Sequence, residues 1–181
     1  MKKRLLAFGR GFSLIELLVV ITIIGILAAV GTGSFTTAQK RSRDAKRKSH
    51  LNALKNALEA YHNDFGQYPA DDMDGKISGC GTDGIALCSW GDEFSNTTKG
   101  TIYMVELPQD PASGQNYYYD TQNFNKAYQL YANLENDQDQ ALNLSGDEIL
   151  TYSGTDCASN TECNYGQSSS NITPESNHQL H

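Results

Sequence analysis

The chain has 181 residues and a formal net charge of −7, but this charge is unevenly distributed. Residues 1–48 carry ten of the 14 basic residues, whereas residues 49–181 carry four lysines against 19 acidic residues, a net charge of −15. An acidic C-terminal region of this kind stays soluble, and its charge argues against nucleic-acid binding by that region. The length allows one long helix and one modest domain.

An apolar run from Phe12 to Val30 follows a short basic segment at the N-terminus. Because a helix rises 1.5 Å per residue, roughly 20 residues cross a bilayer, and the run is a candidate transmembrane helix. Its one charged residue is Glu16, and a carboxylate within a membrane helix costs about 2.5–3.5 kcal/mol on insertion scales. The helix itself offers no cation. Glu16 therefore needs a partner from a lipid headgroup, another chain or a new amine made by cleavage nearby.

The residues Gly11-Phe12-Ser13-Leu14-Ile15-Glu16, between a basic leader and an apolar helix, closely resemble the N-terminal signal of type IV prepilins and type II secretion pseudopilins. The resemblance implies that residues 1–11 are a leader and that a membrane-bound prepilin peptidase cleaves between Gly11 and Phe12. Phe12 then becomes the N-methylated first residue of the mature chain. The resemblance also implies assembly, in which Glu16 of one subunit pairs with the Phe12 amine of the next.

A pilin-like α+β fold follows from the same resemblance: one long N-terminal helix, transmembrane in its first half, packed against a small antiparallel sheet of three to four strands. The implied partners are other copies of the chain and related pilins, prepilin peptidase, membrane-bound assembly machinery and, before assembly, inner-membrane lipid. The basic residues on either side of the span give no clear orientation. We place the N-terminus inside, because the cysteines of the head then lie in an oxidising compartment. The expected location is first the cytoplasmic membrane, as a single-pass protein, and then an extracellular or periplasmic filament.

A conventional secretory signal is the alternative interpretation of the N-terminus, with cleavage between Ala29 and Ala38. The mature chain would then be a secreted, calcium-binding globular protein. Against this alternative, the apolar run is longer than the usual span of about 7–15 residues, contains Glu16 and lacks a clean cleavage site between small residues.

The helix is predicted to continue well beyond the apolar run. No proline occurs before Pro69, and Gly66 is placed to cap the C-terminus of the helix. Large side chains recur at steps of three and four, the spacing of one helical face, at Leu51, Leu54, Leu58, Tyr61 and Phe65. We therefore predict a transmembrane or filament-core segment over residues 12–36 and an amphipathic half over residues 37–66 that packs against the head.

Six basic residues lie between positions 40 and 48. This charge density could bind anionic lipid or nucleic acid. Since no aromatic side chain lies between the charges, we favour a solvated helix face that complements the acidic heads of other subunits.

The head is predicted over residues 67–163 and contains all four cysteines, in two closely spaced pairs. An even number of cysteines in loop-rich sequence indicates two disulfides. The spacing favours bonds between Cys80 and Cys88 and between Cys157 and Cys163, although four cysteines permit three connectivities. Zinc binding is the alternative, but neither pair has CxxC spacing.

The first part of the head, residues 70–100, is rich in Gly, Asp, Ser and Thr and is predicted to be a disulfide-stapled connecting loop. Residues 116–120 and 126–134 have the composition of strands, 101–107 that of a strand or a short helix, and 148–152 is a further candidate strand. Along 126–134, one set of alternate residues can cover the helix while the other faces water.

A second resemblance lies in the head. The residues Leu107-Pro108-Gln109-Asp110-Pro111, followed by Tyr117, Tyr118 and Tyr119, resemble a segment of major pseudopilins. The resemblance ends at Ala112, where that family usually has Trp-Gly.

Asp137, Asp139 and Asp147 offer carboxylate oxygens in and after an acidic loop. Calcium favours six to eight oxygen ligands in a flexible loop, and major pseudopilins bind calcium in the corresponding loop. These three residues are therefore candidate calcium ligands. An acidic surface turn is the alternative, because the spacing is not that of an EF-hand.

The sequence contains no nucleophile elbow, phosphate loop or metal-ligand helix, so a structural role is predicted rather than an enzyme. Residues 164–181 are polar and are predicted to form a mobile tail. The favoured function is that of a structural subunit in a type IV pilus-like or type II secretion pseudopilus filament, with calcium as the one candidate cofactor.

Overall fold

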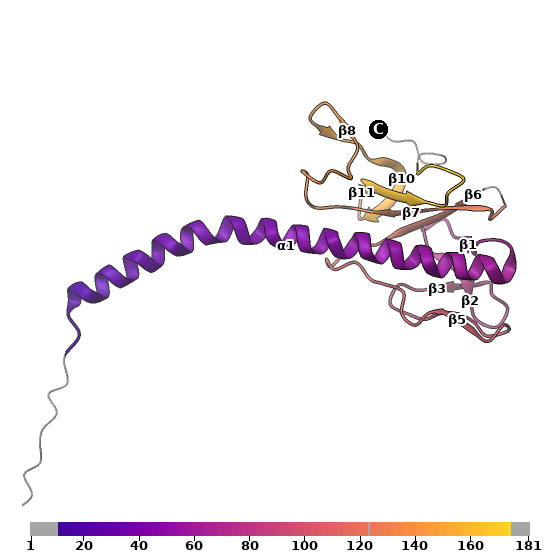
Figure 1. Cartoon of the computed structure of the whole chain (residues 1–181), viewed down its shortest axis with the longest axis horizontal. Coiled ribbons are helices and arrows are strands. Elements are labelled where there is room, and N and C mark those ends of the chain that lie inside the picture. Colours follow the sequence, from indigo (N-terminus) through magenta and orange to yellow (C-terminus); the bar gives the residue numbers. More distant parts are fainter. Residues whose placement is uncertain (1–10, 123, 175–181) are drawn as a thin grey trace, which may run out of the picture. The chain divides into compact units, whose positions relative to one another are not determined.

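The computed structural model describes residues 11–122 and 124–174, with the side chains of residues 30–34 excepted. The chain divides into an N-terminal unit, residues 1–39, and a C-terminal unit, residues 40–181. One helix, α1, spans Leu14–Phe65 and contributes to both units (Figure 1). The long helix predicted from the apolar run and the later periodicity is confirmed.

Both ends of α1 are capped by nearby residues. The backbone N–H of Ser13 donates to a carboxylate oxygen of Glu16 at 3.0 Å, which is half of the reciprocal pattern known as a capping box. At the other end, Gly66 adopts a φ of 69°, and its N–H donates to the carbonyl of His62 at 2.7 Å. This left-handed turn is accessible to glycine at little cost and ends the helix as predicted.

Large apolar side chains of the N-terminal unit are exposed, Phe12 just before α1 and Ile15, Ile21 and Leu27 along it. Among the residues whose side chains are described, no helical stretch is both long and apolar enough to cross a membrane. The predicted span of residues 12–36 includes residues 30–34, whose side chains lie outside the described set. The transmembrane assignment stays a prediction.

The strands of the C-terminal unit cluster along the second part of α1 (Figure 1) and form several small antiparallel sheets. The first sheet has the order β1-β2-β3, from strands Ala70–Asp71, Ile77–Cys80 and Ala86–Cys88. The second is a hairpin of β4 and β5, Phe94–Asn96 and Thr101–Met104. The prediction of a connecting loop over residues 70–100 is therefore wrong. Its strands have only two to four residues in Gly- and Asp-rich sequence, which is too short to show the alternation of apolar and polar residues that identifies a strand.

The central sheet has the order β12-β7-β6, from strands Tyr165–Ser168, Ala127–Ala132 and Tyr118–Gln122. Two further hairpins are formed by β8 and β9, Leu144–Ser145 and Glu148–Ile149, and by β10 and β11, Tyr152–Ala158 and Thr161–Cys163. The predicted hairpin of residues 116–134 is confirmed as β6 and β7. The single sheet of three to four strands is replaced by several smaller sheets, within the predicted α+β class.

The end of the head differs from the prediction. Strand β12 pairs with β7 from Tyr165 to Ser168, so the proposed boundary between a head ending at residue 163 and a mobile tail is wrong. Residues 175–181 of the predicted tail lie outside the described residues.

The core forms where the amphipathic face of α1 meets β6 and β7. Leu51, Leu54 and Leu58 are fully buried against a cluster that includes Tyr119, Tyr128 and Leu130. This confirms the predicted packing face of the helix.

The opposite face of β7 is also buried, contrary to the predicted alternation between helix-facing and water-facing residues. On that side Tyr131 packs with Tyr118, Tyr152 and the cysteines of the β10–β11 hairpin. The hairpin comes from sequence 20 or more residues away, so the local pattern of β7 gave no sign of it.

Candidate functional site

The predicted cleavage junction precedes α1. Gly11 and Phe12 lie in non-helical backbone before Leu14, and both are exposed. Among the described residues other than its chain neighbours, no heavy atom lies within 4 Å of the position that a Cβ on Gly11 would occupy. Cleavage between Gly11 and Phe12 stays a prediction.

Glu16 lies in an apolar setting on the first turn of α1. Its carboxylate accepts the Ser13 N–H, and no basic side chain among the described residues pairs with it. Together with Phe12, Ile15, Val19 and Val20 it lines a shallow depression of about 520 Å³. The start of α1 therefore presents one carboxylate among apolar side chains, with no cationic partner from the described residues.

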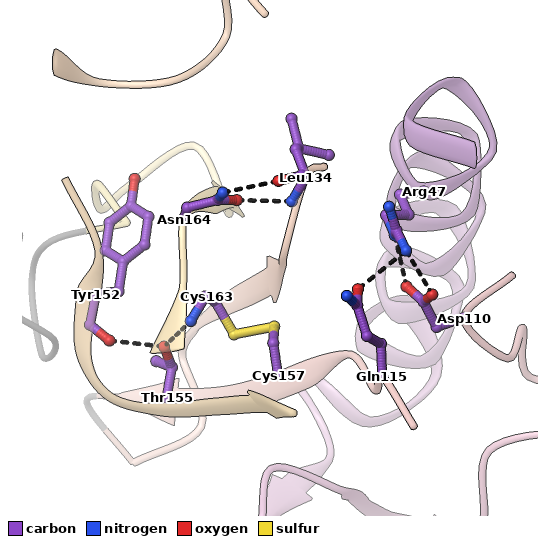
Figure 2. Close-up of a disulfide and its surroundings, with 9 residues drawn as sticks. All are labelled: Arg47, Asp110, Gln115, Leu134, Tyr152, Thr155, Cys157, Cys163 and Asn164. Carbon is purple, nitrogen blue, oxygen red and sulfur yellow. Dashed lines mark hydrogen bonds and ion pairs between the residues drawn. A yellow bond between two sulfur atoms is a disulfide. The ribbon is translucent and has the colours of Figure 1, made fainter. Parts of the chain in front are cut away.

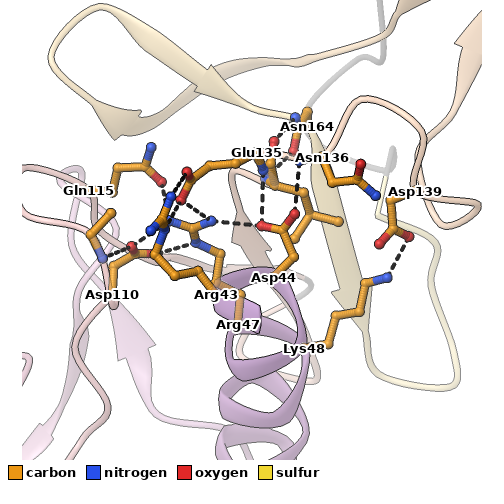
Figure 3. Close-up of polar contacts among 12 residues, drawn as sticks. Arg43, Asp44, Arg47, Lys48, Asp110, Gln115, Glu135, Asn136, Asp139 and Asn164 are labelled. Carbon is orange, nitrogen blue, oxygen red and sulfur yellow. Dashed lines mark hydrogen bonds and ion pairs between the residues drawn. The ribbon is translucent and has the colours of Figure 1, made fainter. Parts of the chain in front are cut away.

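A second feature, the ionic cluster, fixes α1 to two loops of the C-terminal unit (Figure 3). Arg47 lies at its centre with a side chain that is fully buried. Its guanidinium donates to both oxygens of Asp110, at 2.7 and 2.8 Å, and to the amide oxygen of Gln115 at 2.9 Å. It also lies 2.7 Å from Asp44 and 2.8 Å from Glu135. Arg47 thus joins the helix to loop residues 63 to 88 positions away, which accounts for the burial of a charged group.

The other members of the ionic cluster are Arg43, Asp44, Glu135 and Asn136. Arg43 donates to both carboxylate oxygens of Glu135, at 2.7 and 2.5 Å. Asp44 accepts the backbone N–H groups of Glu135 and Asn136, at 2.9 and 2.8 Å. The segment after β7 is therefore held to the helix by side-chain and backbone bonds together.

These contacts shift the pKa values of Arg47 and Glu135. Burial alone lowers the pKa of Arg47, but its bonds to Asp110, Asp44 and Glu135 outweigh this effect and raise the pKa above the ordinary value. The bond from Arg43 lowers the pKa of Glu135 to about 2 from its usual 4.5, against an opposing effect of burial. Both groups are therefore charged at neutral pH.

The basic segment at residues 40–48 divides into two groups. Arg43 and Arg47 belong to the ionic cluster, and Lys48 pairs with Asp139 at 2.5 Å. Lys40, Arg41 and Lys46 are exposed. The interpretation of the whole segment as a solvated face that complements other subunits is therefore wrong for half of its cations, whose acidic partners lie in the same chain.

Two disulfides are present with the connectivity that the spacing favoured. Cys80 and Cys88 link β2 to β3, with Cα atoms 5.5 Å apart, and Cys157 and Cys163 link β10 to β11, with Cα atoms 5.1 Å apart. All four cysteines are bonded. The second disulfide is fully buried beneath β7.

The β10–β11 hairpin is also fixed by two polar side chains that sequence reasoning missed (Figure 2). Asn164 binds both backbone groups of Leu134, accepting from the N–H at 2.7 Å and donating to the carbonyl at 2.9 Å. The Thr155 hydroxyl donates to the Tyr152 carbonyl at 2.7 Å and accepts the Cys163 N–H at 3.1 Å. The Asn164 bonds join residues 30 positions apart, and the Thr155 bonds lie within an irregular hairpin, so no local sequence pattern predicts them.

The proposed calcium ligands are not gathered into one site. Within residues 11–122 and 124–174, no group of three or more His, Cys, Asp or Glu side chains is arranged to hold a metal ion. The carboxylate of Asp139 is paired with Lys48, while Asp137 and Asp147 are exposed. Calcium binding by Asp137, Asp139 and Asp147 stays a prediction that has no preformed site to support it.

These features define a class of protein: a pilin-like subunit, with an exposed apolar helix that carries one acidic residue near its start and a head of small antiparallel sheets. Comparison with known proteins agrees. A model of the prokaryotic N-terminal methylation motif matches residues 9–32. Type II secretion system core protein G of Vibrio cholerae is 31% identical over 109 residues, which cover 60% of this chain and 68% of that protein. The chain therefore belongs to the family of type IV pilins and type II secretion pseudopilins.

Two further relatives match over a shorter part of the chain. The type IV major pilin protein PilA of Myxococcus xanthus is 42% identical over 60 residues, 33% of this chain and 27% of that protein. The type IV wide pilus major component PilA4 of Thermus thermophilus is 42% identical over 63 residues, 35% of this chain and 48% of that protein. The chain thus spans less than two thirds of the length of several curated relatives. No solved structure gave a significant match.

Proposed function

We propose that this chain is a non-enzymatic structural subunit of a type IV pilus-like or type II secretion pseudopilus filament. The observation that carries the proposal is Glu16, a carboxylate with no cationic partner among the described residues, on an exposed apolar helix within a matched methylation motif. Membership of a family whose named relatives include pilins and secretion core proteins supports it.

The proposed maturation begins with cleavage between Gly11 and Phe12 by prepilin peptidase, followed by methylation of the Phe12 amine. A methylated amine keeps its basicity and stays largely cationic near neutral pH, since α-amino groups have a pKa of about 7.7–8.0. Within its own chain, the Glu16 carboxylate already accepts the backbone N–H of Ser13. The amine of a neighbouring subunit is free to approach.

Assembly then solves two problems of the isolated helix together. Packing of residues 12–36 against other copies removes apolar side chains such as Ile15 and Leu27 from lipid or water. In that apolar interior the pair of Glu16 and the neighbouring Phe12 amine neutralises two charges that are costly alone. The proposed partners are therefore other copies, related pilins, prepilin peptidase and the membrane-bound assembly machinery.

The C-terminal unit forms the filament surface in this proposal. Two disulfides are consistent with an oxidising location, so we propose that the subunit is first anchored in the cytoplasmic membrane and then displayed in a periplasmic or extracellular filament.

Mass spectrometry of the mature N-terminus tests the proposal. The expected result is a chain that starts at Phe12 and carries one additional methyl group on its amine. A start between Val30 and Gln39 would instead identify a conventional secretory signal and would leave no role for Glu16. Retention of residues 1–11 in purified filaments would also contradict the proposal.

A further inference from the structure

A polar depression of about 430 Å³ lies on the C-terminal unit, between the turn at residues 89–90 and the loop at residues 109–117. This volume falls within the usual range of small-molecule sites, about 300–1,000 Å³. The lining combines Trp90, the one tryptophan of the chain, with hydroxyl and amide side chains and a single cation, Lys76. None of these residues belongs to the N-terminal unit that carries the processing motif.

The loop that forms one wall of the depression is anchored at several points. Asp110 is bound by Arg47 through two hydrogen bonds, and Gln115 accepts a third from the same guanidinium (Figure 2). The next residue, Asn116, donates its backbone N–H to the Cys157 carbonyl at 2.7 Å. Because the wall is already ordered, a ligand would lose little free energy in fixing it.

Trp90 is also anchored by contacts with the loop. Its ring packs edge-on against buried Tyr117, with centroids 5.7 Å apart, and its carbonyl accepts a hydrogen bond from the Gln109 side chain at 3.1 Å. The indole is nevertheless only partly buried. The depression is therefore bordered by a fixed aromatic ring with accessible apolar surface.

The polar groups around Trp90 are mostly neutral. The side chains of Ser89 and Asn116 are exposed and form no hydrogen bond with any described residue, so they are free to donate and accept. The one carboxylate in the lining, Asp110, is already neutralised by Arg47. The site thus offers uncharged donors and acceptors next to an aromatic surface.

We propose that this depression binds a neutral saccharide. A sugar ring has an apolar face of C–H groups, which can pack on the indole of Trp90, and a rim of hydroxyls, which can bond to Asn116 and Ser89. Anionic sugars and nucleic acids are disfavoured because residues 49–181 carry a net charge of −15. This inference goes beyond the proposed filament function and does not depend on it.

The lone tryptophan provides a site-specific test. The full-length protein is purified in a detergent without a sugar headgroup, and its tryptophan emission is measured during titration with the methyl glycosides of glucose, galactose, mannose and N-acetylglucosamine. We expect at least one glycoside to change the emission saturably, with a Kd on the order of 1 mM. Asn116→Ala should weaken that binding by about tenfold through loss of one hydrogen bond.

Asn52→Ala is the matched control, because Asn52 is an exposed amide on α1 outside the depression, and it should leave binding unchanged. Ser89→Ala provides a second pocket variant, and circular dichroism checks the fold of each protein. The proposal is overturned if no glycoside changes the emission even at a concentration tenfold above the expected Kd. It is also overturned if Asn116→Ala and Ser89→Ala both bind as the wild type does. A response only to sialylated sugars or heparin would likewise overturn it.

Discussion

Arg47 and Asp110 are 63 residues apart in the sequence, yet two hydrogen bonds join their side chains and both side chains are fully buried. A planar guanidinium matches the two oxygens of a carboxylate, so the pair fixes the position of the loop as well as its distance from the helix. The same guanidinium reaches Asp44 and Glu135. One side chain on α1 therefore organises two separate loops of the head.

Replacement of Arg47 should destabilise the protein strongly. Arg47→Met keeps an unbranched apolar stem but leaves Asp110 and Asp44 buried without their cation, and breaking such a pair costs about 3–5 kcal/mol. The free energy of unfolding, measured by chemical denaturation of the full chain in detergent micelles, should fall by that amount. Arg41→Met, on an exposed neighbour of the same helix, should change it by less than about 0.5 kcal/mol. Equal effects of the two substitutions would show that the ionic cluster is not needed for stability.

The free energy of unfolding should also depend on pH, because the protonation of Glu135 differs between the folded and unfolded states. Its pKa is lowered to about 2 in the folded protein from an ordinary value of 4.5, so the folded state holds the ionised form more strongly than the unfolded state does. The resulting stabilisation is fully present above about pH 4.5 and is lost as the pH falls towards 2.

Denaturation midpoints measured across this pH range provide the test. The wild type should lose stability between pH 4.5 and 2, and Glu135→Gln should lose less, because it has no proton to gain at this position. Glu106→Gln, at an exposed carboxylate, should follow the wild-type curve. A Glu135→Gln curve parallel to that of the wild type would contradict the role assigned to Arg43.

The parts of the fold that were predictable from sequence are those set by neighbouring residues. The spacing from Leu51 to Phe65 identified the buried face of α1, and Gly66 identified its end, because both depend on local backbone geometry. Two closely spaced cysteine pairs likewise indicated their own connectivity.

The ionic cluster was not predictable in the same way. In sequence, Arg43 and Arg47 look like two more members of a solvated basic run, and nothing local distinguishes them from Lys40 or Lys46. Their partner Glu135 lies about 90 residues later in the sequence and contacts the helix only in the folded chain. Asp110 is part of the segment that resembles major pseudopilins, but its sequence context does not predict the pairing with Arg47.

Removal of the Asn164 side chain should loosen the second face of the central strand β7. Asn164 satisfies both backbone groups of Leu134 at a largely buried position, so Asn164→Ala leaves one donor and one acceptor without partners. We expect a loss of about 1–3 kcal/mol in unfolding free energy. Hydrogen exchange should show faster exchange of the Leu134 amide. Asn52→Ala is the control, and an unchanged Leu134 exchange rate in Asn164→Ala would contradict this assignment.

Substitution of Glu16 separates its two proposed contributions, capping the start of α1 and neutralising a neighbouring amine. Glu16→Ala removes both. Glu16→Gln keeps an oxygen that can accept the Ser13 N–H but carries no charge. If the charge drives assembly, both variants should insert into the membrane at least as well as the wild type, since an ionised carboxylate there costs about 2.5–3.5 kcal/mol.

Both Glu16 variants should nevertheless form few filaments, because the amine of an incoming subunit would then be buried in an apolar surface without a counter-charge. Membrane fractionation measures insertion, and negative-stain microscopy of sheared filaments measures assembly. Glu106→Ala is the control for removal of an exposed carboxylate from the head and should assemble normally. Abundant filaments from Glu16→Gln together with few from Glu16→Ala would show that helix capping, rather than charge pairing, is what the filament requires of this residue.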